Sequence, residues 1–139
     1  MARQKTSVVS TEKKQIISDM IGLAKADNIL HEREYEFILA VAARLGLSKT
    51  EVDTLHANPL KISVLSTELQ RITQFHRLLL LMNVDQETHF TELDAIRNYG
   101  LKLGIRPEAI EQILSEMDDH ENKMIPSTRL VEIFKRFYN

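Results

Sequence analysis

DNILHERE at residues 27–34 and DQETHFTE at residues 85–92 repeat one polar pattern 58 positions apart. Each has an aspartate, a histidine four positions later and a glutamate three positions after that; these residues are Asp27, His31, Glu34, Asp85, His89 and Glu92. The pattern lies in an ungapped match of residues 20–55 to residues 78–113, with seven identities in 36 positions where chance would give about two. We interpret this match as an internal duplication.

The spacing of apolar residues predicts an all-α fold. Apolar residues recur every three or four positions along almost the whole chain, which has only four glycines and three prolines. We expect about seven helices in one bundle-like domain over residues 11–139, with two pseudo-symmetric repeats at about 16–57 and 74–115. Residues 1–10 are expected to form a flexible tail, and a C-terminal helix over 128–138 to dock on the bundle.

Local signals indicate where several helices begin and end. Gly46 and Gly104 can end helices in the left-handed conformation, and Pro107 suits a first helical position. The segment 66–84 is apolar on most sides, which is typical of a central, buried helix. Its main predicted stripe consists of Leu69, Ile72, Phe75, Leu79 and Met82.

Composition limits the classes of partner. The net charge of -2 provides no field to attract nucleic acid, and the longest apolar run, Leu78 to Met82, is too short to span a bilayer. We therefore expect a cytoplasmic protein that binds neither nucleic acid nor membrane. Because the chain has no cysteine, any metal would need oxygen and nitrogen ligands.

One interpretation of the repeated residues is architectural. His31 and His89 fall at helix starts, and a glutamate three residues later, Glu34 or Glu92, can accept the backbone N–H of the cap residue. Asp27, like its counterpart in the second repeat, can accept backbone N–H groups of its loop. All six residues would then shape loops and helix starts without a ligand.

The other interpretation is that the repeated residues bind a divalent cation. Carboxylate oxygen and imidazole nitrogen suit zinc, manganese or ferrous iron, and the carboxylates alone suit calcium or magnesium. A cation would also compensate the negative charge of Asp27 and Asp85 beside helix C-termini. If the two loops meet, each repeat could contribute up to three ligands, and the sequence does not identify the metal.

Other candidates are weaker. The segment Asp118 to Glu121 resembles a ligand cluster but falls in a polar break, where a solvated acidic loop is the common outcome. The chain has no glycine-rich phosphate loop, G-x-S-x-G or H-E-x-x-H motif, and no signature of a small-molecule substrate. We expect a protein that is not an enzyme.

The segment from Leu23 to Glu34, followed by the Leu45-Gly46-Leu47 helix end, resembles the tellurite-resistance TerB-like family. In that family an Ala-Asp-Gly loop leads to a helix with a glutamate seven residues after the aspartate. The second copy, Val84 to Glu92 with Leu103-Gly104-Ile105, resembles the second half of the family, so the likeness covers about residues 12–117.

The chain departs from the family pattern at two places in each copy. The glycine after the aspartate is Asn28 in the first loop and Gln86 in the second, and glutamine tolerates a left-handed backbone less well. The small residue usual before the helix is His31 or His89. The resemblance carries over only the acidic residues at 27, 34, 85 and 92, so the histidines are specific to this chain.

The resemblance implies a small bacterial helical domain with an acidic, metal-associated site and a stress-response or accessory role. Our first expectation is a non-enzymatic domain that binds a divalent cation or a partner through its acidic loops. The alternative is a structural interaction module, in which the same residues cap helices and an exposed face recruits another protein or a second copy of the chain.

Overall fold

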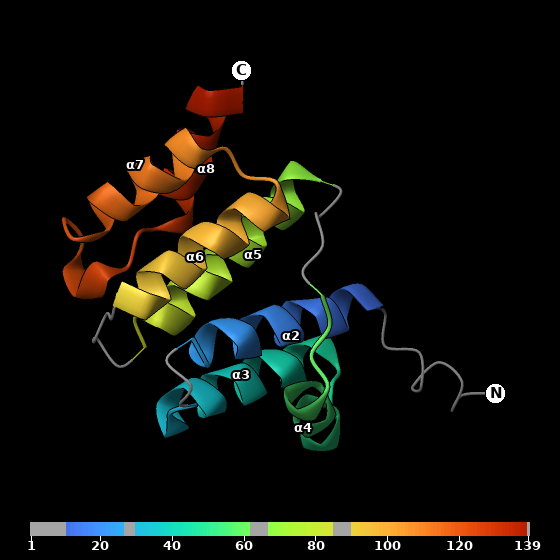
Figure 1. Ribbon diagram of the computed structural model, residues 1–139. Helices are drawn as coiled ribbons and strands as arrows, with labels where there is room; N and C mark the ends of the chain where they lie inside the picture. Colours follow the sequence, from blue (N-terminus) through green and yellow to red (C-terminus); the bar gives the residue numbers. More distant parts are fainter. Residues whose placement is uncertain (1–10, 27–29, 62–66, 85–89, 139) are drawn as a thin grey trace.

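The computed structural model describes residues 11–26, 30–61, 67–84 and 90–138, although the side chains of residues 90, 91 and 138 are not described. These segments form seven α-helices and one short 3-10 helix, with no strand among them. Figure 1 shows their arrangement. The bounds are α2 Thr11–Ala24, α3 Glu32–Leu45, α4 Lys49–Ala57, α5 Glu68–Met82, α6 Phe90–Leu103, α7 Pro107–Met117, η1 Glu121–Lys123 and α8 Ser127–Tyr138. The all-α prediction is confirmed. The tail predicted at 1–10 lies outside the described residues.

Helix bounds in the two halves follow the offset seen in the sequence. Both α3 and α6 have 14 residues, and α6 begins and ends 58 positions after α3. Gly46 and Gly104 follow these helices with φ of 88° and 96°. In each half the residue after the glycine donates its backbone N–H across the helix end, Leu47 to Ala42 O and Ile105 to Gly100 O, both at 2.9 Å. The same left-handed glycine cap therefore ends both helices.

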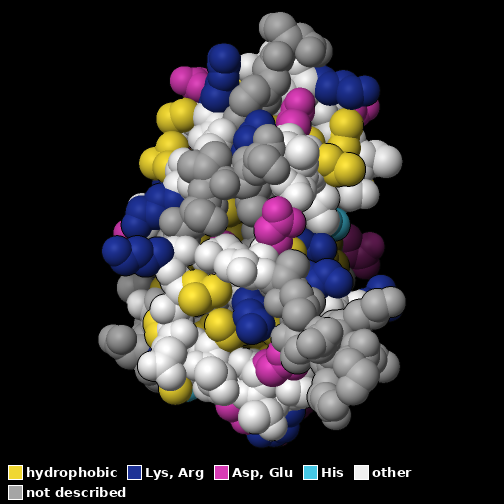
Figure 2. Space-filling view, turned by 90° about the vertical axis from the view of Figure 1, so that its right-hand side faces the viewer, with side chains coloured by type: hydrophobic (Ala, Val, Ile, Leu, Met, Phe, Trp, Pro, Cys, Tyr) yellow, Lys and Arg dark blue, Asp and Glu magenta, His cyan; other side chains and the backbone are white. Residues whose placement is uncertain are grey.

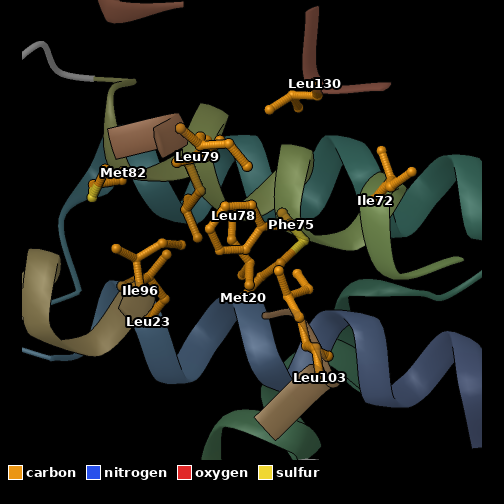
Figure 3. Close-up of a cluster of buried hydrophobic side chains, with 14 of the residues drawn as sticks. Met20, Leu23, Ile72, Phe75, Leu78, Leu79, Met82, Ile96, Leu103 and Leu130 are labelled. Atoms are coloured by element: carbon orange, nitrogen blue, oxygen red, sulfur yellow. The ribbon is translucent and has the colours of Figure 1, made fainter. Parts of the chain in front are cut away.

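Helices α2 and α5 form the centre of the bundle. Helix α2 contacts α3, α4, α5 and α6, and α5 contacts α2, α3, α6 and α8. Their inward side chains are fully buried, including Met20 and Leu23 from α2 and Phe75 and Leu78 from α5. Figure 3 shows these side chains converging with Ile96 and Leu103 of α6. Burial of this contiguous apolar cluster is the main stabilising contribution to the fold.

The two halves differ in how the central helix is covered. Helix α4 packs directly on α2, whereas in the second half α8 packs on both α5 and α7. Leu130, Ile133 and Phe134 of α8 are buried there. A forked ion pair joins α8 to α7, since Arg129 Nε and Nη2 each donate to one oxygen of Glu116 at 2.8 Å. Helix α8 is thus held on the bundle by both apolar packing and an ion pair.

One predicted core position is wrong. Leu69 is 70% exposed although it belongs to the apolar stripe of α5. It lies in the first turn of α5, at the N-terminal end of the helix. There it lines one shallow pocket with Ile16 and another with Val131. The periodicity is correct, but the neighbouring helices do not cover this turn.

The surface carries charges of both signs. Figure 2 shows Lys and Arg side chains interspersed with Asp and Glu and with small hydrophobic groups on the face that it presents. None of the described helices combines the length and apolar character needed to cross a membrane.

Candidate functional site

The six residues predicted as ligands divide between the described and undescribed parts of the chain. Asp27, Asp85 and His89 lie outside the described residues. The other three, His31, Glu34 and Glu92, stand at the starts of α3 and α6. Figure 1 shows the C-terminal ends of α2 and α5 and the starts of α3 and α6 all on the left of the view. The described helix ends of both helix–loop–helix corners therefore lie on the same side of the molecule.

His31 is the N-cap residue of α3. Its backbone is extended, with φ of −72° and ψ of 151°, which turns the chain into the helix. The backbone N–H of His31 donates to Glu34 Oε1 at 3.3 Å. This is the hydrogen bond that the architectural interpretation predicts for the glutamate.

Glu34 is buried to an unusual degree for a carboxylate. Its exposed fraction is 2%, and Glu92, at the same third position of α6, is 4% exposed. Glutamates are rarely this buried unless they are paired, because an isolated charge in an apolar environment is very unfavourable. No buried side-chain nitrogen or oxygen in the described residues lacks a hydrogen-bond partner. The two carboxylates are thus fixed structural elements of their corners.

The described residues alone do not assemble a metal site. Within them, no group of three or more His, Asp and Glu side chains has the geometry to hold a cation. The proposed ligand set includes Asp27, Asp85 and His89, which fall outside that part of the chain. The described geometry therefore supplies one buried carboxylate per corner.

The other acidic segment is a solvated loop, as the sequence indicates. Asp118, Asp119 and Glu121 are exposed, and His120 is half-buried. Asp118 Oδ1 lies 3.9 Å from Lys123 Nζ, a long ion pair at the surface. This loop joins α7 to η1 and has no buried carboxylate.

Sequence reasoning missed a buried acid in the middle of α2. Asp19 is 2% exposed and accepts a hydrogen bond from Gln15 Nε2 at 2.8 Å. Burial raises the pKa of Asp19 to about 7, and the hydrogen bond from Gln15 opposes part of that rise. Burial and the nearby Asp19 charge together raise the pKa of Tyr99 to about 12. The available signal was a polar pair four residues apart, with the apolar residues Met20 and Ile21 directly after Asp19.

Comparison with known proteins bears on the first half of the chain. Residues 1–57 match the sequence model of the family described as Tellurite resistance protein TerB. The matched region contains Asp27, His31 and Glu34 and ends before the second corner. No curated protein and no solved structure gives a significant match. Residues 1–57 are therefore similar to the TerB family, and the all-helical fold agrees with that similarity.

Proposed function

We propose that the chain is a non-enzymatic TerB-like accessory domain of a bacterial stress response that binds a divalent cation through its two acidic corners. The ligands would come from Asp27, His31 and Glu34 in the first corner and from Asp85, His89 and Glu92 in the second. Each corner lies where an aspartate follows a helix C-terminus, so a cation would offset local negative charge.

The observation that carries this proposal is the matched burial of Glu34 and Glu92, 2% and 4% exposed at equivalent helix positions. Burial removes a carboxylate from water, and both halves keep one buried at the start of a helix. A cation partly coordinated by such a group would be held by a preorganised, low-dielectric oxygen ligand.

A second candidate function has its own observation. The hydrogen bond from His31 N–H to Glu34 shows that this carboxylate caps α3. On this view the corners are purely architectural and the domain is an interaction module for another protein or for a second copy of itself. Leu69, Leu101 and Met124, which are 70%, 49% and 44% exposed, are apolar groups that such a partner could cover.

Calorimetric titration distinguishes the cation-binding domain from the interaction module. Purified, chelator-treated protein would be titrated separately with Mn²⁺, Zn²⁺, Ca²⁺ and Mg²⁺, and its as-purified metal content measured by mass spectrometry. We expect one cation to bind, and Asp27→Ala/Asp85→Ala to weaken it at least tenfold. The matched control is Asp118→Ala/Asp119→Ala, which removes the same charge from the solvated loop. Identical flat titrations for wild type and variant would refute the cation proposal.

A second pair of variants separates coordination from capping. Glu34→Gln/Glu92→Gln keeps an amide oxygen that can accept the cap N–H but removes both charges. We expect native helicity with weakened cation binding. If imidazoles are ligands, affinity also falls as the pH drops from 7.5 to 5.5, because imidazolium cannot coordinate.

A further inference from the structure

Residues of α3 and α5 line a groove between the two helices. Its volume is about 410 Å³. Four half-buried apolar side chains line it, Phe37, Val41 and Leu45 from α3 and Leu80 from α5. Leu80 is the one member of the run 78–82 that is not buried in the core. The groove is therefore apolar along its length.

Two arginines border this apolar surface. Arg77 of α5 is half-buried and Arg44 of α3 is exposed. Arg77 Nη1 donates to Gln74 Oε1 at 3.2 Å, and the fully buried Gln74 is itself held by the carbonyl of Ile16. Burial lowers the pKa of Arg77, and no carboxylate among the described residues pairs with its guanidinium. Most of its donors thus remain available for an anion.

In the other half of the molecule, side chains fill the position that corresponds to this groove. At the 58-residue offset, Val41 corresponds to Tyr99 and Leu80 to Gly22. The Tyr99 hydroxyl lies over Gly22 so closely that a Cβ there would clash with it. The cation is also replaced, because Arg77 corresponds to the buried acid Asp19. The same fold can therefore fill this position with one tyrosine, and the α3–α5 side leaves it open and cationic.

The dimensions favour a small molecule over a protein surface. Ligand pockets typically enclose about 300 to 1,000 Å³, a range that contains this groove. A stable protein interface uses roughly 20 to 30 residues a side, many more than the seven described residues that line it. An apolar body would lie along the four hydrophobic side chains, and an anionic group would reach the guanidinium of Arg77.

We propose that the α3–α5 groove is a binding site for a small amphiphilic anion, a carboxylate on an aliphatic chain. Arg77 binds the carboxylate, with its guanidinium oriented by Gln74, and Arg44 adds charge at the rim. Binding in this groove requires no metal, so the result of its test does not depend on whether the acidic corners bind a cation.

Decanoate, below its micelle concentration and with chelator present, is the test probe. Titration followed by amide chemical shifts should show saturable binding, with the largest changes at Val41, Leu45, Arg77 and Leu80. Decanol and decyltrimethylammonium have the same chain with neutral and cationic heads, and we expect both to bind at least tenfold more weakly. Equal binding of the three probes, or no decanoate binding, would overturn the proposal.

Variants locate the site. Arg77→Met preserves an unbranched apolar stem and should weaken decanoate about tenfold or more, since a charge-assisted hydrogen bond is lost. Arg44→Met should weaken it about two- to fivefold. Lys102→Met is the matched control, because Lys102 holds the equivalent position on α6, and its affinity should not change. Ala40→Glu places a carboxylate on the exposed rim and should abolish binding by competing for the arginines. If Arg77→Met loses native helicity, the Ala40→Glu variant becomes the deciding test. Unchanged decanoate affinity in Ala40→Glu would disprove the assignment of the site.

Discussion

Gly100 of α6 lies directly against Ile110 of α7. A Cβ built on Gly100 would be 2.6 Å from Ile110 Cδ1 and 3.0 Å from Phe75 Cε1. At the equivalent positions of the first half the residues are Ala42, Val52 and Ile17. The larger pair Ile110 and Phe75 is thus accompanied by glycine, and the smaller pair by alanine. In each half three side chains fill this part of the core, but the volume is divided among them differently.

Gly100→Ala should therefore destabilise the protein. Alanine in a helix interior normally gains about 1 kcal/mol over glycine. Overpacking a filled core costs about 1 to 3 kcal/mol, and here the added methyl meets two buried side chains. We expect a net loss of up to about 2 kcal/mol in the free energy of unfolding, measured by urea denaturation with circular dichroism.

Ile110→Val tests whether that loss comes from this contact. Valine lacks the Cδ1 atom that a Cβ at residue 100 would meet at 2.6 Å. The double variant Gly100→Ala/Ile110→Val should lose less stability than the sum of the two single variants, whereas strict additivity would place the strain elsewhere.

Glu34 provides a test of the cap itself. Glu34→Ala removes the acceptor of the His31 N–H and leaves space at a buried position. We expect it to lower the free energy of unfolding by about 1 to 3 kcal/mol. Glu34→Gln retains an acceptor and should lose much less. Equal losses in the two variants would mean that the charge, rather than the cap, stabilises this corner.

Helix positions could be predicted from the sequence because their signals are local. Gly46 and Gly104 adopt the left-handed conformation that their place after an apolar stripe indicates. The His31–Glu34 hydrogen bond follows from a three-residue spacing. Each of these depends on residues a few positions apart, which periodicity and capping rules can describe.

Features that depend on packing between distant helices could not be predicted. Asp19 is buried where α2 packs among its neighbouring helices, and the sequence of α2 does not show which helices cover it. Leu69 is exposed because none of the described helices covers its turn. The α3–α5 groove depends on Arg77, Val41 and Leu80 meeting across a helix pair. The sequence shows these residues but not their proximity.

The Arg129–Glu116 pair should support stability at neutral pH and fail in acid. Hydrogen bonds from Arg129 and Gln112 lower the pKa of Glu116 to about 2 from 4.5. Its folded-state pKa lies below the unfolded value, so this stabilisation is present above about pH 4.5 and is lost as the pH falls towards 2. Glu116→Gln should flatten the acid limb of a plot of melting temperature against pH. Glu36→Gln, on the exposed face of α3, is the control and should follow the wild type.

Asp19 should give the opposite dependence at higher pH. Burial raises its folded-state pKa from 3.8 to about 7, so between these values the folded chain holds a proton that the unfolded chain releases. Stability conferred by the protonated carboxyl is complete below about pH 4 and is lost as the pH rises to about 7, by up to about 4 kcal/mol. Asp19→Asn keeps an oxygen for the Gln15 donor and cannot ionise. We expect it to match the wild type at pH 4 and to be the more stable protein at pH 8, measured by urea denaturation. Asp118→Asn, which removes an exposed charge, should show no such difference; parallel curves for wild type and Asp19→Asn would mean that Asp19 is ionised in the folded protein throughout this range.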